Sequence, residues 1–558
     1  MARQERSMAS SFAAAFLAVA IYGTIVGAKE PLHERIDRLI EAQPGFPRAA
    51  PPASDDEFLR RVTLDVTGII PSAPKARRFL ADSSPQKRHE LVDRLLESPE
   101  YPRHMQRVFD RLLMQRRRHR GVSPVEWREY LIDSFRTNKP WDQLTREILG
   151  ADGTEEKIRA AAKFYLDRQV NVTALVRDVG TIFLGRDLHC AQCHDHPVIE
   201  EWEQTDFYSL AAFLTRSVLF TDKKTQQTLV GERADGEATF TSALTQITGE
   251  APPRLFDGEL LTEPKLKKGE EYIVAPDDGA RPVPKFSRRA ELTPRIIAHS
   301  GFARNIVNRL WAQLMGRGLV HPVDQHNDEN PASHSELLDL LASEFVASGY
   351  DLKVVLRELL STRTYARTSR LSAAPEGVEP DHFAVAKLRP LSPDQQAWSL
   401  ARAVGRFDQE QLALVAELTH ADPELLAVME SSPQTREEVL HDRLIAEVDS
   451  VANIFVTSLP GQAERSEATP DQSLFMMNGE LVGKWLVRKP GNLVDRLAKL
   501  DNVDALSDEL YLSILSRYPA KEEREWIGEH LKSYDDVAPA CADLVWALLT
   551  STEFRFNY

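Results

Sequence analysis

Apolar residues recur at helical spacing along most of the chain, and polar start signals precede several of these stripes. The run 54–57 has the composition of a capping box, in which side chains bond the free backbone N–H groups at a helix start. The apolar residues that follow it share one helical face: Phe58, Leu59, Val62 and Val66. A second start at Ser84-Pro85 precedes Leu91, Leu95 and Leu96, and another stripe runs over 127–135. The first third of the chain is therefore predicted to be a helical array.

A further apolar stripe lies just before the most unusual segment of the sequence. Its members are Val172, Leu175, Val176, Val179 and Phe183. Gly185 is expected to end this helix because glycine tolerates the left-handed conformation found at helix C-termini. The segment Cys190-Ala191-Gln192-Cys193-His194 follows directly.

The character of the chain changes from about residue 216 to 288, where Thr, Gly and Pro become frequent. The short runs Ala238–Thr241 and Tyr272–Val274 fit strands better than helices. We therefore predict a small β-rich insertion between two helical regions.

Helical spacing resumes near Arg289 and is strongest after residues 333–336, which have the composition of a second capping box. Gly349 is expected to end that helix, and Asp351 to begin the next, so that the pair forms a helical hairpin. The chain from about 390 to 558 is again predicted to be helical, with a turn at Ser431-Ser432-Pro433.

These patterns predict a mainly α fold, a multi-domain helical array with a small β-rich insertion. A length of 558 residues is too long for one core. The predicted limits are a signal peptide over 1–28, an N-terminal helical domain over 29–215, the insertion over 216–288 and a C-terminal helical domain over 289–558.

The N-terminus has the layout of a secretory signal. Arg3 and Arg6 precede an uncharged apolar stretch over 9–26, and Val26-Gly27-Ala28 offers small residues to a signal peptidase. We expect cleavage after Ala28. The alternative is an uncleaved N-terminal anchor, since a run of this length could just cross a membrane. Either interpretation exports the rest of the chain, to the periplasm or beyond, with no further membrane span.

Charge and cysteine content narrow the class of protein. Acidic residues outnumber basic ones by 84 to 69, and the net charge of -15 would repel the phosphate backbone of nucleic acid. The basic run 116–120 is interpreted as a solvated helix face without a function. Three cysteines are too few for a disulfide-stapled scaffold, and Cys541 lacks an obvious partner.

The Cys-x-x-Cys-His segment is typical of covalent attachment of c-type haem. Two thiols at this spacing can each reach one vinyl group, and the following imidazole can serve as an axial iron ligand. Cys190, Cys193 and His194 meet this requirement, and two of the three cysteines of the chain fall in the segment. Haem c is therefore the predicted cofactor.

Two other chemistries remain open for the same residues. Cys190 and Cys193 could form a local disulfide or a redox dithiol, since their spacing is also that of thioredoxin-type sites. They could instead bind zinc or iron with His194 or His196. Zinc is disfavoured because no second cysteine pair exists, although His189 could contribute. His196 points to a different helical face from His194 and is better explained as a residue that fixes the loop.

The sixth iron ligand is not identified by the sequence. Four methionines are candidates by residue type alone, although most methionines simply fill cores: Met105, Met114, Met476 and Met477. A second polar cluster could bind a cation or a substrate, but a solvated capping loop is the favoured interpretation: His321, Asp324, His326, Asp328, Glu329 and His334.

Several motifs in order resemble those of a known architecture, the exported planctomycete-type proteins that pair domains of unknown function 1549 and 1553. In the first half they are 58–61 with Asp65 and Gly68, 95–101, 138–143 and 190–197; in the second they are 305–311, 316–320, 334–338 and 361–365. The resemblance implies an exported protein with a haem-like Cys-x-x-Cys-His-x-His-Pro segment and no established reaction. The Arg-rich run within 114–121 departs from the expected pattern.

These observations predict a periplasmic c-type haem protein that acts in electron transfer or an oxidoreductase step, with a periplasmic redox partner and an unknown substrate. The alternative is a non-catalytic binding or structural protein of the cell envelope, in which Cys190 and Cys193 form a disulfide or part of a metal site. Whether the chain is an enzyme is left open by its sequence.

Overall fold

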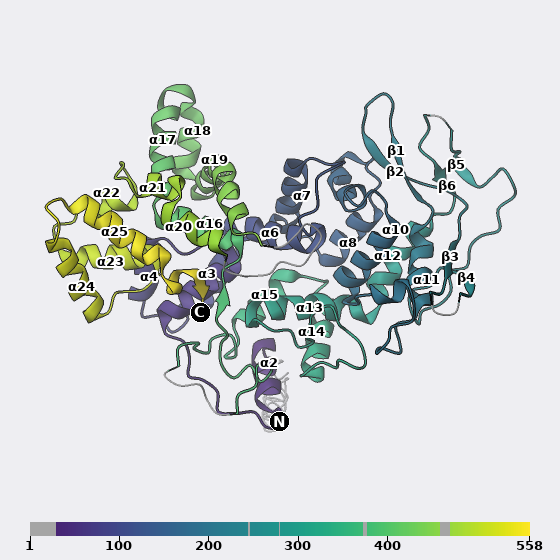
Figure 1. The fold of residues 1–558 in the computed structure, drawn as a ribbon, viewed down its shortest axis with the longest axis horizontal. Helices are drawn as coiled ribbons and strands as arrows, with labels where there is room; N and C mark the ends of the chain where they lie inside the picture. Colours follow the sequence, from purple (N-terminus) through teal and green to yellow (C-terminus); the bar gives the residue numbers. More distant parts are fainter. Residues whose placement is uncertain (1–29, 244–245, 278, 372–376, 458–468) are drawn as a thin grey trace, which may run out of the picture.

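The fold is mainly α-helical, as the hydrophobic pattern predicts, and its helices form two lobes placed side by side (Figure 1). A computed structural model describes residues 30–243, 246–277, 279–371, 377–457 and 469–558. The predicted signal peptide lies outside these residues. Within them, no helix has both the length and the apolar character needed to cross a bilayer.

The first part of the chain forms a helical array. Its α-helices are α2 (Leu32–Glu41), α3 (Asp55–Thr67), α4 (Ala73–Ala81), α5 (Lys87–Leu96), α6 (Glu100–Met114), α7 (Pro124–Arg136), α8 (Trp141–Gly150), α9 (Lys163–Leu166), α10 (Val172–Val179) and α11 (Gln204–Leu214). Three short helices of other types accompany them: the 3-10 helices η1 (Glu156–Ala162) and η3 (Cys190–Gln192), and the π-helix η2 (Gly180–Leu184). Gly185 ends η2 with a φ of 69°, as predicted.

The β-rich insertion is confirmed and consists of three antiparallel two-stranded sheets at one end of the molecule (Figure 1). The strands are β1 (Ser217–Thr221), β2 (Thr228–Glu232), β3 (Ala238–Thr241), β4 (Thr248–Ala251), β5 (Tyr272–Val274) and β6 (Val283–Pro284). In the β3–β4 pair Ala238 lies opposite Ala251, and Thr241 opposite Thr248.

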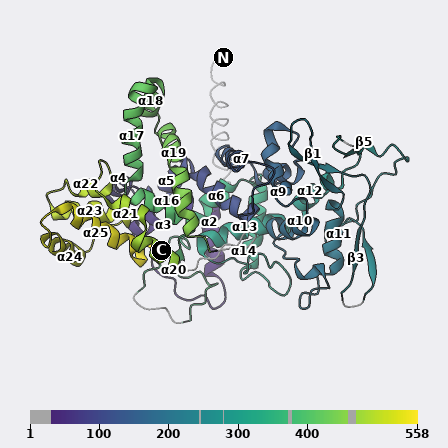
Figure 2. The same cartoon turned by 45° about the horizontal axis from the view of Figure 1, so that its top comes forward.

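The remaining helices divide between the two lobes. Those that precede residue 370 are α12 (Arg288–Ala298), α13 (Ser300–Met315), α14 (Ser335–Ala347) and α15 (Leu352–Leu360). The second lobe contains α16 (Pro393–Ala403), α17 (Arg406–Ala421), α18 (Pro423–Ser431), α19 (Pro433–Ile454), α20 (Pro470–Asn478), α21 (Glu480–Leu486), α22 (Leu493–Leu497), α23 (Val503–Ile514), α24 (Lys521–Lys532), α25 (Val537–Thr550) and α26 (Thr552–Arg555). Helices α17 and α18 project from this lobe in both views (Figures 1 and 2).

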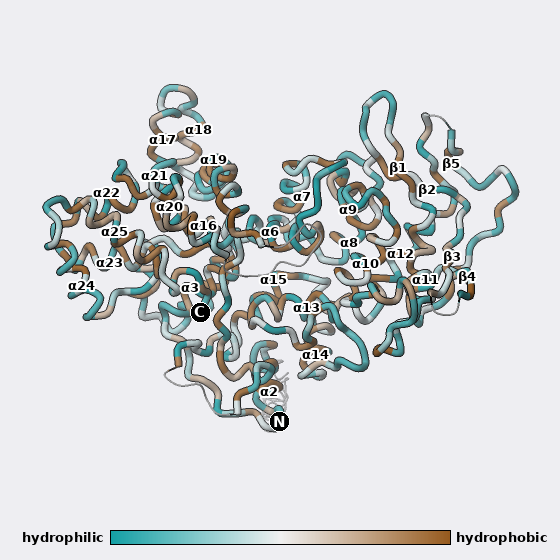
Figure 3. The backbone as a smooth tube through the Cα atoms, viewed as in Figure 1, coloured by the Kyte–Doolittle hydropathy of each residue, from teal (hydrophilic) through white to brown (hydrophobic). Residues whose placement is uncertain are grey.

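Each lobe has its own apolar core. Hydrophobic and hydrophilic positions alternate along the helices of both lobes (Figure 3), as amphipathic helices require. Residues 36–360 supply nearly all of the first core, so α12–α15 pack with α2–α11. The second core is built from residues 391–554 together with Leu64, Ile69 and Ile70. The cores thus separate near residue 390.

A short sheet and one shared helix connect the lobes. Strand β7 (Arg389–Pro390) pairs with β8 (Phe556–Asn557), which brings the end of the chain back to the start of the second lobe. Helix α3 faces both cores, with Phe58 and Val62 in the first and Leu64 in the second.

Two predicted capping boxes are not formed. Ser54 is the N-cap of α3, but its side chain caps nothing, because Glu57 instead accepts a hydrogen bond of 2.5 Å from the buried Arg61 guanidinium. At α14 the N-cap is His334 rather than Ser333, whose hydroxyl donates to the Leu319 carbonyl at 3.2 Å. The side chains that were predicted to cap these helices therefore form hydrogen bonds with other groups instead.

Candidate functional site

The Cys-x-x-Cys-His segment forms a tight turn between η2 and α11, with its two thiols facing solvent. Residues Cys190–Gln192 make one turn of 3-10 helix, and the Cys193 N–H donates to the Cys190 carbonyl at 3.2 Å. Leu188 and Ala191 are fully buried and anchor the turn, which leaves Cys190 and Cys193 exposed. Both cysteines are free thiols in the structure.

His194 is oriented by its own loop. Its Nδ1 lies 2.7 Å from the Asp195 carbonyl oxygen. A carbonyl only accepts hydrogen bonds, so Nδ1 carries the proton and Nε2 keeps its lone pair. A hydrogen bond from Nδ1 to a backbone carbonyl is common for metal-ligating histidines, because it fixes both the tautomer and the direction of the ring.

His196 has a different environment, which favours the loop-fixing interpretation. Its Nδ1 accepts hydrogen bonds from the backbone N–H groups of Val198 at 3.3 Å and Ile199 at 3.0 Å. The ring meets the buried Trp202 edge-on, with centroids 5.4 Å apart. The Nδ1 lone pair is therefore used within the loop rather than directed at a ligand.

Helix α11 and the insertion hold the segment from two sides. At the start of α11, the Gln204 backbone N–H donates to Asp195 Oδ1 at 2.8 Å, and its side-chain amide donates to the Gln192 carbonyl at 3.1 Å. From the β3–β4 hairpin, the Ala243 N–H donates to the Cys193 carbonyl at 3.2 Å. The β-rich insertion thus helps to position the cysteine turn.

An aromatic pair lies beside Cys193. Tyr208 of α11 stacks on Phe240 of β3, with ring centroids 5.0 Å apart. Burial, and then the neighbouring Cys193 sulfur, raise the pKa of Tyr208 above its usual value. The tyrosine is therefore neutral at physiological pH and offers a hydroxyl close to the thiol.

The structure places the second polar loop directly against the cysteine segment. The His326 N–H donates to the Gly185 carbonyl at 2.9 Å, and the Asp187 N–H donates to the Asp324 carbonyl at 3.1 Å. Farther along, the Asp328 N–H donates to a Glu201 carboxylate oxygen at 3.0 Å. Two clusters that lie more than 100 residues apart in sequence therefore form one polar region.

Two buried asparagines of α13 support this region, and the sequence interpretation gave them no role at the site. Asn305 Nδ2 donates to the Ile182 carbonyl at 2.7 Å, and Asn308 Nδ2 lies 3.3 Å from His326 Nε2. Burial, and then Arg309, lower the pKa of His326 to about 4, so this imidazole is neutral at physiological pH. The motif 305–311 contained both asparagines, but spacing alone could not show that they face η2 and His326.

Other members of the predicted clusters lie apart from one another. His334 is buried against Phe383, with ring centroids 5.6 Å apart. Across the part of the chain that the structure describes, no group of three or more His, Cys, Asp or Glu side chains could hold a metal ion. Zinc or iron binding by Cys190, Cys193 and the nearby imidazoles stays an untested prediction, as does a cation site in the loop 321–334.

Three of the four candidate methionines are core residues. Met105 and Met114 belong to the first core and Met476 to the second, whereas Met477 is exposed. Cys541 is also buried, and burial raises the pKa of its thiol to about 11, which makes it unreactive near neutral pH.

Comparison with known proteins identifies two matching families. Residues 35–218 match the family described as protein of unknown function (DUF1549), and residues 288–531 match the family described as protein of unknown function (DUF1553). The first match includes the cysteine segment. No curated protein and no solved structure matches the chain. Neither family description states an activity, so the chemistry has to be argued from the site.

Proposed function

We propose that the function of this protein resides in covalent haem c held by Cys190, Cys193 and His194. The DUF1549 and DUF1553 family descriptions state no activity, so the proposal rests on the site itself. The observation that carries this proposal is the geometry of the turn. Both thiols face outward, and the imidazole that follows them keeps Nε2 available for a ligand. A donor set of two free thiols and one oriented imidazole fits attachment through two thioethers and axial ligation.

The residues of the chain have distinct parts in this proposal. Cys190 and Cys193 would hold the haem covalently, and His194 would supply a ligand to its iron. Gln204 and the β3–β4 hairpin keep the turn in place through the carbonyls of Gln192 and Cys193. Haem at this position would supply one-electron redox chemistry. The exposure of the turn suits exchange of electrons with a periplasmic partner in electron transfer or an oxidoreductase step.

The test is to produce the full chain in a bacterial periplasm with the haem-maturation machinery present. We expect the haem absorption to survive denaturation and the protein mass to increase by one haem. Cys190→Ala and Cys193→Ala should each abolish attachment through one thioether, and His194→Ala should change the absorption spectrum. Cys541→Ala is the matched control, since its thiol is buried in the other lobe and should leave haem content unchanged.

Loss of haem on denaturation of the native protein would overturn the proposal. A mass lower by two hydrogens, located to the peptide with Cys190 and Cys193, would instead support the alternative of a non-catalytic cell-envelope protein with a local disulfide. Haem that stays covalently bound in the double variant Cys190→Ala/Cys193→Ala would show that the attachment residues are assigned wrongly.

A further inference from the structure

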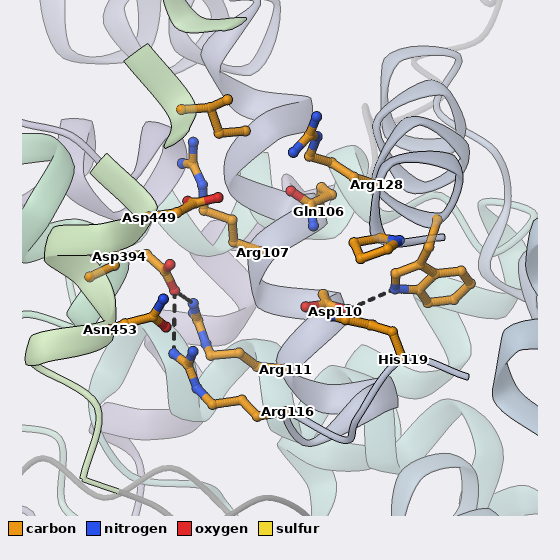
Figure 4. A pocket seen from close by; sticks show the side chains of 14 residues that line it. Gln106, Arg107, Asp110, Arg111, Arg116, His119, Arg128, Asp394, Asp449 and Asn453 are labelled. Carbon is orange, nitrogen blue, oxygen red and sulfur yellow. Dashed lines mark hydrogen bonds and ion pairs between the residues drawn. The ribbon is translucent and has the colours of Figure 1, made fainter. Parts of the chain in front are cut away.

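A second polar site lies where the two lobes meet, far along the chain from the cysteine segment. It is a cavity of about 210 Å³ between α6 and α7 of the first lobe and α16 and α19 of the second (Figure 4). Its charged and polar lining comprises Gln106, Arg107, Asp110, Arg111, Arg116, His119, Arg128, Asp394, Asp449 and Asn453. The cavity is far more polar than a gap left by core packing.

The basic run 116–120 contributes to this cavity, so the interpretation of that run as a solvated helix face is wrong. Helix α6 ends at Met114, and Gln115 and Arg116 both adopt left-handed backbone conformations, with φ of 47° and 53°. Such conformations cost roughly 1 kcal/mol or more for residues other than glycine. They turn the chain so that Arg116 and His119 line the cavity while Arg117 pairs with Asp178 at 3.0 Å.

Part of the charge in the cavity is already compensated. Arg111 forms a short ion pair with Asp394, and Arg116 lies 3.9 Å from the same carboxylate. Asp110 accepts a hydrogen bond of 2.7 Å from the Trp127 indole N–H. Figure 4 shows the contacts of Asp394 on the side of the cavity formed by α16, and the hydrogen bond of Asp110 on the opposite side, toward α7.

Two guanidinium groups that line the cavity form no direct ion pair with a carboxylate of the described residues, although Asp449 lies near enough to both to interact with them electrostatically. Arg107 stacks over the Trp398 ring at 4.6 Å and lies 2.6 Å from His441 Nε2, and burial lowers its pKa to about 10. Arg128 of α7 forms no hydrogen bond or ion pair with any residue that the structure describes. Four arginines line the cavity against three aspartates, so an anion bound there would balance the excess positive charge.

We propose that this cavity binds a small hydroxylated organic or inorganic oxyanion, with Arg107 and Arg128 as the anion-binding residues. Guanidinium groups suit carboxylate, sulfate and phosphate because their N–H donors match the geometry of these oxyanions. Asp110 and Asp449 line the same space and can accept hydrogen bonds from hydroxyl groups of the ligand. The volume corresponds to about seven water molecules, so the ligand is a small molecule rather than a polymer.

The test is a calorimetric titration of the full chain with three small polar probes. Tartrate represents a hydroxylated carboxylate, phosphate a tetrahedral oxyanion, and threitol an uncharged polyol. We expect tartrate or phosphate to bind at low salt, and threitol not to bind. Which anion binds more tightly identifies the oxyanion that the site prefers.

Substitution of Arg128 tests the assignment directly. Arg128→Gln should weaken anion binding at least about tenfold, because it removes a charged hydrogen-bond donor. Arg136→Gln is the matched control: Arg136 lies on the same helix, outside the cavity, and should leave affinity unchanged. Circular dichroism should show that both variants remain folded.

The proposal is overturned if neither anion binds, if threitol binds as tightly as tartrate, or if Arg128→Gln keeps the affinity of the native protein. None of these results depends on haem, because the cavity shares no residue with the cysteine segment. Failure here therefore leaves the proposed haem function intact, and failure of haem attachment leaves this site intact.

Discussion

Gly185 is the residue at which the cysteine segment and the loop 321–330 come closest. Its φ is 69°, and a Cβ atom at this position would lie 2.5 Å from the His326 ring and 3.0 Å from Asn305 Oδ1. We expect Gly185→Ala to lower the free energy of unfolding by about 2–4 kcal/mol, since backbone strain and a steric clash add together. Urea denaturation measures this change.

Gly349→Ala serves as the control for Gly185→Ala. Gly349 has a similar φ of 73°, but its Cβ would meet no atom within 4 Å. Only the conformational cost of about 1 kcal/mol should remain. Equal losses in the two variants would show that contact between the two loops does not constrain Gly185.

His326 should make stability depend on pH. Its pKa is about 4 in the folded chain, against 6.5 for an unperturbed histidine. Between these values the unfolded chain binds more protons than the folded chain, so the free energy of unfolding should fall as pH drops from 6.5 to 4. His326→Gln removes this titration and keeps an acceptor for Asn308.

The measurement for His326 compares urea denaturation of the two proteins at several pH values. The native protein should lose more stability between pH 6.5 and 4 than the variant, by on the order of 2 kcal/mol. The difference between the proteins at pH 7.5, where His326 is neutral in both states, sets the baseline. Parallel profiles would contradict the assignment of a neutral, buried imidazole.

Among the helices, α7 has a complete capping box that the sequence interpretation did not single out. The Ser123 hydroxyl accepts from the Glu126 N–H at 3.1 Å, and the Glu126 carboxylate accepts from the Ser123 N–H at 3.0 Å. Ser123→Ala should therefore cost about 1 kcal/mol of unfolding free energy. Ser54→Ala should cost much less, because the Ser54 side chain caps nothing. Thermal denaturation of both variants distinguishes them, and a larger loss for Ser54→Ala would refute the structural assignment.

Local patterns predicted the elements well where a single helix or strand determines them. The stripe 172–183 and Gly185 gave the end of η2, and Ala238–Thr241 coincides with β3. The pattern failed at Ser54, Ser333 and the basic run, where partners distant in sequence determine the side-chain contacts. For the candidate site, Cys190–His194 was visible from spacing alone. Its contacts with the loop 321–330 were not, because no periodicity encodes which loops meet.

At the scale of the whole molecule, α3 joins the two lobes through buried polar side chains as well as apolar contacts. Arg60 donates to the carbonyls of Ile514 at 3.1 Å and Phe554 at 2.8 Å in the second lobe. Arg61 donates to the Tyr365 carbonyl at 2.7 Å and to the Tyr558 carbonyl at 3.0 Å. Since these donors have no access to water, separation of the lobes would leave them uncompensated unless solvent entered. The lobes, and the cavity between them, are therefore held in a fixed arrangement.

Asp65 is the centre of this connection and gives the sharpest test of it. Its carboxylate accepts hydrogen bonds from the Tyr365 hydroxyl at 2.8 Å, Arg389 at 2.7 Å and the Asn557 amide at 2.8 Å. Asp65→Ala leaves the Arg389 cation without its buried partner and should lower the free energy of unfolding by about 3–5 kcal/mol. Differential scanning calorimetry of the variant should then resolve two unfolding transitions, one for each core. In the native protein the two cores should unfold more nearly together.

Asp56→Ala on the same helix is the control for Asp65→Ala, because it removes an ion pair of comparable length, 3.1 Å to Arg370, that is partly exposed. Water compensates exposed charges, so this loss should be below about 1 kcal/mol and should leave the shape of the calorimetric trace unchanged. If the two substitutions had equal effects, burial of the Asp65 carboxylate would not be what couples the lobes. The cavity at the junction would then have to be held by the apolar contacts of α3 alone.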